Sequence, residues 1–437
     1  MDEFTATMLA IGMIFALMAI GVPVFAALGL AGVFGVVMVE DLDFMLNRLK
    51  AFSYTQTASY PLTVIPLFIL MGNLAQQAGV GQRLFNVARK WVGHLPGGLA
   101  VASMLTSTGF ACTSGSSVAT AATVGAVALP EMRKAGYDPR LATGTVAAGG
   151  VLGVLIPPSV LLVFYAALTE VSAGRMLIAG IVPGALSALI FIIGIVLISL
   201  ARPPSVKVER YNWKERLVSL KEAWQVIVLF VIVLGGIYFG LVTPTEAAAV
   251  GAFTAFLMLL FAVRGRRKLL TSLENSFRSS ITTTVMVLMT MLGAGIFSYF
   301  LTLVQVPQYF AEYITSFEVS PMLIIGLLLL LYFPLGMFLD SFSMLVITLP
   351  VMFPAVQALG FDPIWFGILA VKMCEIGLIT PPVGLNCFVI AGIDRDTPLV
   401  DIFRGAGWFV AMEIVTLLLL FFVPEIITWL PNSMMGS

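Results

Sequence analysis

Polar residues that could bind an ion or a small solute gather at four places in this chain. The first half holds a hydroxyl cluster, Thr113 to Ser117 (TSGSS), and a glycine-rich run that ends in a proline pair, Gly149 to Ser159 (GGVLGVLIPPS). The second half holds Gly336 to Ser343 (GMFLDSFS) and Gly377 to Asn386 (GLITPPVGLN). Each half therefore combines a small polar cluster with a proline pair.

The proline pairs predict broken helices. Two adjacent prolines remove two amide donors and clash with the preceding turn, so a helix must break at Pro157-Pro158 and at Pro381-Pro382. Non-helical backbone inside a membrane is tolerated only where protein surrounds it or where it lines a cavity, and its free carbonyls suit sodium. The small, hydroxyl-rich stretch before each break can turn sharply. We expect each half to supply a hairpin whose tip faces its own broken helix, and the two units to form one site.

Simpler interpretations stay open for each motif alone. Gly and Ser in a membrane helix also serve close packing, and proline can produce only a kink. Recurrence of the same pairing in both halves favours a site. Asp340 is an ionisable group in an apolar run, which marks a functional candidate, although a carboxylate at a helix end could also reach water. Lys372 and Glu375 lie three residues apart and are expected to pair with each other, and Thr243 and Glu246 have the spacing of a capping box.

Composition indicates that these elements lie in a membrane. Hydrophobic residues make up 59% of the chain and charged residues 11%, and the mean hydropathy is +1.04. A soluble domain carries about a quarter charged residues. Several apolar runs are long enough to cross a hydrocarbon core, which takes about 20 helical residues. The runs do not alternate in character as barrel strands would, so the predicted fold is an all-α, multi-pass membrane protein.

Several function classes are disfavoured. The net charge is zero, which gives no basic field for nucleic acid, and three cysteines with one histidine do not form a zinc or haem pattern. The chain lacks a GxxxxGK[ST] phosphate loop, a GxSxG motif and an HExxH motif. We therefore expect no organic cofactor and no enzymatic activity, and favour transport driven by an ion gradient. A membrane enzyme with acids near the hairpin tips is the alternative from a different class.

The two halves resemble each other at a fixed offset of 224 residues. Eight residues of the first half, mostly Gly, Pro and Asp, recur in the second half at this offset: Pro130, Gly136, Asp138, Pro139, Gly153, Pro157, Pro158 and Leu161. Shared hydrophobicity does not explain a match concentrated on these residue types, so we interpret it as an internal duplication.

Basic residues indicate how the two halves are oriented. They are concentrated in two loops, which the positive-inside rule assigns to the cytoplasm: Arg202, Lys207, Arg210, Lys214, Arg216 and Lys221 in one, and Arg264, Arg266, Arg267 and Lys268 in the other. The connector at 131–140 carries three basic residues and its counterpart at 355–364 carries none. Equivalent loops would then lie on opposite faces, which predicts an inverted repeat, with a parallel repeat as the alternative.

These patterns divide the chain into three parts. The first repeat covers 1–201, with scaffold helices, a hairpin at about 97–134 and a broken helix at about 140–170. A cytoplasmic amphipathic linker covers 202–222, with Tyr211 and Trp213 as interfacial anchors. The second repeat covers 223–437, with scaffold helices, a hairpin at about 332–358 and a broken helix at about 362–392.

Four runs also resemble a known family. Phe110 to Gly125 (FACTSGSSVATAATVG), Gly149 to Ser159, Thr243 to Ala249 (TPTEAAA) and Thr380 to Asn386 (TPPVGLN) are similar to the large, DctM-type membrane subunit of tripartite ATP-independent periplasmic (TRAP) transporters. The resemblance spans nearly the whole chain. It implies a sodium-driven importer of organic acids, such as C4-dicarboxylates, sugar acids or sialic acid, in the bacterial inner membrane. It also implies an elevator, in which a hairpin-bearing transport domain slides against a scaffold.

The resemblance further implies which residues bind the ions and the solute. In this family sodium is held between each hairpin tip and the broken helix beside it. The matching positions form one sodium site from Ser114, Ser117, Gly153, Ile156 and Pro158, and a second from Gly336, Gly377, Thr380 and Val383. The implied solute contacts are Ser116, Asp340, Ser341 and Asn386. Cys112 and Thr113 stand where smaller residues are commoner in the family, which leaves the tip geometry open.

The implied partners are a periplasmic substrate-binding protein and a small four-helix membrane subunit. Some family members fuse the small subunit ahead of the large one. Because this chain starts almost directly with a helix of the large subunit, we expect its small partner to be a separate polypeptide. The alternative within the same broad class is a stand-alone ion-coupled organic anion symporter that needs no binding protein.

Overall fold

The computed structural model describes residues 2–57, 60–202, 211–316 and 318–435, and every regular element in these ranges is a helix. The predicted all-α class is confirmed. The part of the chain before residue 203 contains α1 (Glu3–Ala19), α2 (Val24–Val39), α3 (Leu42–Thr57), η1 (Tyr60–Thr63), α4 (Val64–Gln77), α5 (Val80–Val92), α6 (Gly98–Ser114), α7 (Ser117–Lys134), α8 (Pro139–Leu155), α9 (Val160–Thr169), α10 (Ala173–Ala179) and α11 (Ile181–Ala201).

The remainder contains α12 (Trp213–Ser219), η2 (Leu220–Glu222), α13 (Trp224–Phe230), η3 (Val231–Gly235), α14 (Gly236–Tyr238), α15 (Pro244–Ala262), α16 (Arg266–Leu303), α17 (Val306–Thr315), α18 (Pro321–Gly336), α19 (Ser341–Ala358), α20 (Pro363–Gly377), α21 (Leu385–Ile393), α22 (Leu399–Phe422) and α23 (Glu425–Met435). The elements η1 and η2 are 3-10 helices and η3 is a π-helical segment. The capping box predicted for Thr243 and Glu246 is confirmed at the start of α15.

Helix bounds recur at the offset found in the sequence. The helices α7 and α19 start at 117 and 341 and end at 134 and 358, and α8 and α20 start at 139 and 363, so each pair of bounds differs by 224. Asp138 and Asp362 accept hydrogen bonds from the first turns of α8 and α20. The Pro-Pro peptide bond after each of these helices is cis. The corresponding segments of the two halves therefore share their local structure.

Two helices form the centre of the packed core. All residues from Leu141 to Leu155 in α8 and from Ile364 to Gly377 in α20 are buried. The helix α8 packs on α6, α7, α21 and α22, and α20 packs on α18, α19, α9 and α22. The many Gly and Ala residues of α8 let neighbouring helices approach closely, which is how membrane helices associate. This core carries both proline breaks.

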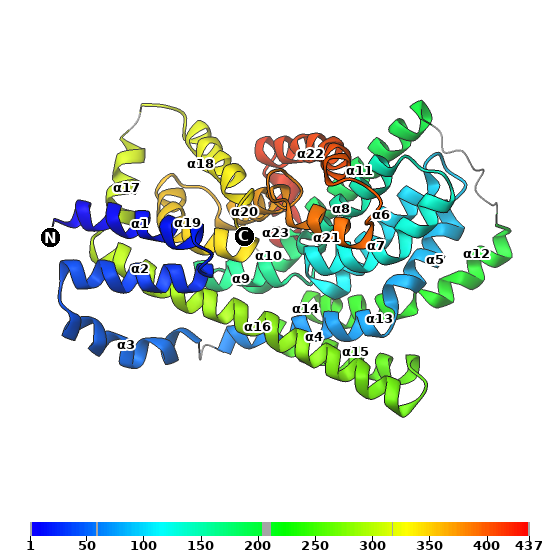
Figure 1. Cartoon of the computed structure of the whole chain (residues 1–437), viewed down its shortest axis with the longest axis horizontal. Coiled ribbons are helices and arrows are strands. Elements are labelled where there is room, and N and C mark those ends of the chain that lie inside the picture. Colours follow the sequence, from blue (N-terminus) through cyan, green and yellow to red (C-terminus); the bar gives the residue numbers. More distant parts are fainter. Residues whose placement is uncertain (1, 58–59, 203–210, 317, 436–437) are drawn as a thin grey trace.

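A second group of helices lies beside this core. The long helix α16 runs across the molecule in Figure 1 and packs on α2 and α4, and α15 packs on α4. By length and composition, five helical segments of the described residues could cross a membrane, or up to eight if each bent pair counts as one span. One bent pair is α8 and α9, whose axes differ by 43°.

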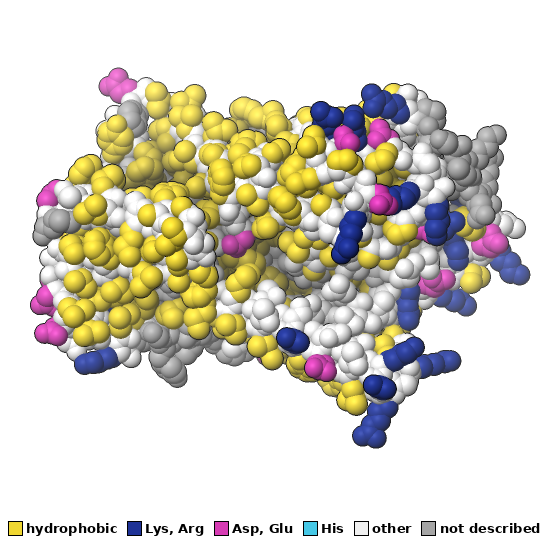
Figure 2. Space-filling model, in the orientation of Figure 1, with side chains coloured by type: hydrophobic (Ala, Val, Ile, Leu, Met, Phe, Trp, Pro, Cys, Tyr) yellow, Lys and Arg dark blue, Asp and Glu magenta, His cyan; other side chains and the backbone are white. Residues whose placement is uncertain are grey.

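Charged residues are unevenly distributed. On the face seen in Figure 2, Lys and Arg gather at the right-hand end, where Figure 1 shows α5 and α12, and apolar side chains dominate the remainder. The helix α12 lies in the predicted linker, where Trp213 is 65% exposed and contacts Trp91 edge-on. Residues 203–210 of that linker, including Lys207 and Arg210, lie outside the described residues.

Candidate solute and ion site

A cavity of about 520 Å³ lies where the two predicted hairpin tips meet the helix breaks. Residues of the α6–α7 turn, the α18–α19 turn and the starts of α9 and α21 form one side, and α4 and α16 form the other. The predicted site residues among its lining are Ser114, Ser116, Ser117, Asp340 and Ser341. The structure therefore brings together polar residues that lie more than 200 positions apart in the sequence.

Four helix N-termini converge on this cavity. Its lining includes Ser117 to Ala119 at the start of α7, Val160 and Leu161 of α9, Ser341 and Phe342 of α19, and Leu385 of α21. Side chains cap three of them: Ser116 accepts from the Ala119 amide, Ser159 from the Leu162 amide, and Asp340 from the Phe342 and Ser343 amides. Helix N-termini carry partial positive charge and attract anions. The lining residues include no Lys or Arg but do include Asp340 and Glu375, so the helix N-termini are the source of positive charge among them.

The first tip packs closely against the break after α8. Gly153 faces it, and a Cβ there would lie 2.6 Å from both the Ser116 carbonyl oxygen and the Thr120 hydroxyl. Ser114 Oγ and Thr120 Oγ1 are 2.7 Å apart. A Cβ at Gly115 would lie 2.8 Å from the carbonyl oxygen of Pro158. Main-chain and hydroxyl oxygens thus crowd together around the residues predicted to form the first sodium site, and this donor set fits a small hard cation.

The second tip makes a similar contact. Gly336 ends α18, and a Cβ at Gly377 would lie 2.5 Å from the Gly336 Cα, so only glycine permits this approach. Thr380 Oγ1 donates to the Ile376 carbonyl oxygen at 2.7 Å. Val383 follows the proline pair and precedes the start of α21. The residues predicted to form the second sodium site thus belong to one tight contact between α18 and α20 and to the turn that follows α20.

Asn386, the remaining predicted solute contact, lies behind the cavity. Its Nδ2 donates to Ser117 Oγ at 2.8 Å and to the Ala147 carbonyl oxygen at 3.2 Å, and its side chain is fully buried. It does not belong to the cavity lining. Asn386 therefore links α21 to the first tip and to α8, and a direct contact with solute stays a prediction.

The predicted pairing of Lys372 with Glu375 is wrong. Lys372 Nζ forms an ion pair with Glu413 of α22 and donates to Ser187 Oγ of α11 at 2.7 Å. Glu375 instead lines the cavity and accepts a hydrogen bond from Ser341 Oγ at 2.9 Å. A spacing of three residues shows only that two side chains are neighbours on one helix. The partners of Lys372 and Glu375 come instead from other helices. The rule that an ionisable residue in an apolar run marks a functional candidate applied to Glu375 as well as to Asp340.

The opposite wall of the cavity is polar but uncharged. Asn73 and Gln76 of α4 and Ser279 and Thr283 of α16 line it. Asn73 Nδ2 donates to Ser280 Oγ at 2.9 Å, which joins the two helices. Sequence reasoning missed this wall because single amides and hydroxyls spread over two helices form no compact motif.

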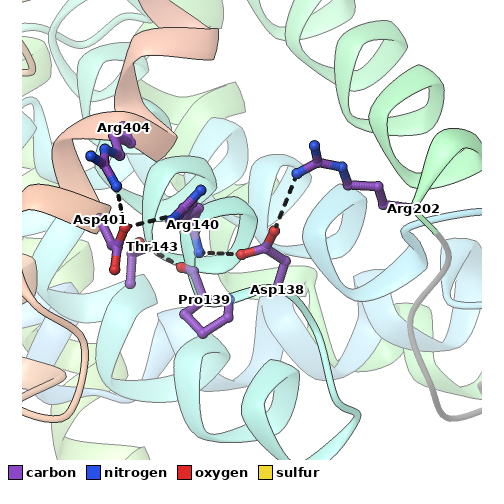
Figure 3. A network of polar contacts seen from close by, with 7 residues as sticks. All are labelled: Asp138, Pro139, Arg140, Thr143, Arg202, Asp401 and Arg404. Atoms are coloured by element: carbon purple, nitrogen blue, oxygen red, sulfur yellow. Dashed lines mark hydrogen bonds and ion pairs between the residues drawn. The ribbon is translucent and has the colours of Figure 1, made fainter.

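Ion pairs between residues outside the cavity lining also join the two halves of the chain. Figure 3 shows Asp401 of α22 between Arg140, whose Nε lies 2.9 Å away, and Arg404, whose Nη1 lies 3.5 Å away. Asp138 accepts from the Arg140 amide and lies 3.8 Å from the Arg202 guanidinium. These contacts hold the start of α8 against the start of α22 and the end of α11.

Comparison with known proteins identifies the family. Residues 11–426 match the model of the family described as "Tripartite ATP-independent periplasmic transporter, DctM component". This chain belongs to the DctM family. The family is a transport family and not an enzyme family, so the alternative of a membrane enzyme is set aside. The resemblance found in the sequence is confirmed, and the cavity lies in a multi-pass membrane permease.

Curated relatives of this DctM-family permease transport different acids according to their names. The C4-dicarboxylate TRAP transporter large permease protein DctM of Pseudomonas aeruginosa is 38% identical over 93% of this chain and 94% of its own length. The sialic acid TRAP transporter large permease protein SiaM of Vibrio cholerae is 32% identical over 86% of this chain and 88% of its own. The isethionate TRAP transporter permease protein DctMQ of Oleidesulfovibrio alaskensis is 34% identical over 93% of this chain and 63% of its own length.

Solved structures show the same fold at low identity. The YdaH transporter of Alcanivorax borkumensis matches with a TM-score of 0.65 and 16% identity, over 98% of this chain and 99% of its own. MtrF of Neisseria gonorrhoeae matches with a TM-score of 0.60 and 13% identity, over 88% of this chain and 86% of its own. The DctM-family chain therefore has a fold that other membrane transporters also adopt.

Proposed function

We propose that this DctM-family protein is the membrane transport subunit of a sodium-driven, binding-protein-dependent importer of organic acids. The observation that carries the proposal is the convergence of four helix N-termini on a cavity without basic side chains. Such an arrangement favours an anionic solute once cations compensate the two carboxylates of the lining, Asp340 and Glu375. The names of the relatives support carboxylates such as C4-dicarboxylates and sialic acid as the class of solute.

Sodium provides the driving force in this proposal. The first ion would be held by oxygens of Ser114, Ser117, Gly153, Ile156 and Pro158, and the second by those of Gly336, Gly377, Thr380 and Val383. Crowded main-chain and hydroxyl oxygens at both tip-and-break contacts support these assignments. Each cation would lie close to the bound solute anion and attract it, so binding of ion and solute would be mutually favourable.

An elevator over inverted repeats would move the site. The recurrence of helix bounds at the offset of 224 supports two repeats, and the cavity lies between the proline-break core and the α4–α16 wall. The ion pairs of Arg140 and Asp138 support a core that moves as one body, because they tie α8 to α22 and α11. The Lys- and Arg-rich end of the molecule would face the cytoplasm of the bacterial inner membrane.

Reconstitution tests the proposal. Proteoliposomes would contain this chain with a small TRAP membrane subunit, and uptake of labelled C4-dicarboxylate and sialic acid would be measured under a sodium or a potassium gradient, with or without a periplasmic binding protein. Uptake that requires both sodium and the binding protein is expected. Uptake without the binding protein would favour the stand-alone symporter, and uptake indifferent to sodium would overturn the coupling.

A further inference from the structure

The buried core carries an unmatched negative charge. Three charged side chains are buried in the described part of the chain, Lys372, Glu375 and Glu413, with exposed fractions of 1%, 1% and 0%. One ammonium thus accompanies two carboxylates. A charge removed from water without a partner is very unfavourable, and more so inside a membrane. Neutralising the second carboxylate therefore requires one bound cation or one proton.

The unmatched charge lies at Glu375. The ammonium of Lys372 is engaged by Glu413 and by Ser187 Oγ, which come from α22 and α11. Glu375 Oε1 accepts from Ser341 Oγ at 2.9 Å, and Glu375 Oε2 is buried without a hydrogen-bond partner among the described residues. Glu375 also lines the cavity, so a small cation bound at the cavity wall would lie next to this carboxyl group.

Both hairpin tips meet at this carboxylate. Ser341 is the first residue of α19, in the second tip, and Ser117 is the first residue of α7, in the first. The hydroxyl of Ser117 faces the Glu375 carboxyl and also accepts a hydrogen bond from Asn386 Nδ2. Asn386 Oδ1 is a second buried oxygen that has no partner in the described ranges. The hydroxyl groups of Ser117 and Ser341, one from each half of the molecule, thus lie beside the Glu375 carboxyl.

We propose that Glu375 supplies an ionised carboxylate to a third sodium site, completed by the hydroxyl oxygens of Ser117 and Ser341. The inference rests on the proposed function and adds one ion to the two tip-and-break sites. The cavity lining includes no Lys or Arg that could neutralise Glu375, so the cation must come from solution. A hydroxyl and carboxylate oxygen set suits a hard monovalent cation.

This site would couple the ion to the solute directly. Without a cation, Glu375 and Asp340 present carboxylates to the cavity and repel an organic acid. Sodium at Glu375 would remove one of these charges and join the two tips around the solute. By linkage, the solute would raise the affinity of this sodium by the same factor as sodium raises that of the solute.

The test measures sodium binding apart from transport. Thermal unfolding of the purified chain with its small subunit would be followed while sodium chloride replaces choline chloride at constant ionic strength, since a ligand that binds only the folded state raises its stability. Glu375→Gln would be compared with wild type and with Glu274→Gln, which changes an exposed carboxylate of α16. Glu375→Gln is expected to weaken the sodium-dependent stabilisation at least tenfold in sodium concentration, while Glu274→Gln behaves as wild type.

A flux measurement counts the ions. The number of sodium ions moved per solute, obtained from the reversal potential in proteoliposomes, is expected to fall by one in Glu375→Gln. An unchanged sodium response and stoichiometry in this variant would overturn the inference. Acidification that replaces sodium in stabilising wild type, but not Glu375→Gln, would also overturn it, because a proton would then neutralise the carboxyl.

A second variant keeps the inference testable if Glu375→Gln fails to fold. Ser341→Ala keeps the carboxylate and removes one hydroxyl ligand, so its sodium response is expected to weaken severalfold; an unchanged response would count against the site. The same measurements distinguish a failure of this inference from a failure of the proposed function. If wild type shows neither sodium-dependent stabilisation nor sodium-driven uptake, the coupling itself is wrong, whereas a wild-type response that Glu375→Gln fully retains refutes only the third site.

Discussion

Gly377→Ala should disturb the second ion site by separating two helices. A Cβ at Gly377 would lie 2.5 Å from the Gly336 Cα, whereas ordinary contact begins at 3.4 Å, so α18 and α20 must move apart by 0.9 Å at this point. The obstructing atoms belong to the backbone of Gly336 and no rotamer change relieves them. Overpacking of this kind costs about 1–3 kcal/mol, of which the better helix propensity of Ala offsets at most about 1 kcal/mol.

The expected functional effect follows from that energy. If the separation destabilises only the ion-bound conformation, a net cost of up to about 2 kcal/mol after the full propensity gain weakens sodium binding by up to roughly 30-fold. The half-saturating sodium concentration for uptake would be measured at fixed solute and membrane potential. Gly392→Ala is the matched control, because Gly392 lies inside α21 and no atom lies within 4 Å of its added Cβ. An unchanged sodium dependence in Gly377→Ala, at normal expression and melting temperature, would refute the link between this contact and ion binding.

Further substitutions test other contacts. Ser117→Leu and Thr380→Leu should each abolish sodium-dependent uptake in a folded protein, as checked by transport and size-exclusion profile; preserved sodium dependence in both would remove the site assignment. Lys372→Met leaves Glu413 buried without a cation and should destabilise the fold by about 3–5 kcal/mol, seen as a lower melting temperature that adding Glu413→Leu largely restores. Asp401→Asn breaks a partly exposed ion pair and should cost about 0–1 kcal/mol, so a large loss of thermal stability would show that the network is stronger than its exposure implies.

The sequence predicted those features that local chemistry determines. Two prolines in succession cannot continue a helix, and α8 ends two residues before Pro157 and α20 four residues before Pro381. The spacing of 224 residues between matching Gly, Pro and Asp residues anticipated the matching bounds of α7 and α19. The all-α class and the family could also be predicted, because composition indicates the class and four short motifs indicate the family.

Features that depend on tertiary contacts could not be predicted from the sequence. The partner of Lys372 is Glu413, 41 positions further along, and nothing in the spacing of residues on α20 points to α22. The position of Asn386 behind Ser117 likewise depends on how α21 packs against α7. Local patterns identified the polar residues, but only the packing of helices shows which of them share a cavity.

The charged side chains among the cavity lining residues are the carboxylates of Asp340 and Glu375, which bears on how the proposed transport could be coupled to cations. A lysine or arginine in the site would hold an organic acid through a permanent charge that does not depend on sodium. In the proposed mechanism, helix dipoles would hold the anion more weakly, and the carboxylates of Asp340 and Glu375 would oppose it until cations bind. The loaded core would then carry compensated charge, whereas the core with solute but without sodium would not. Charge balance at the hairpin tips thereby gives a physical reason why the solute should move only together with its ions.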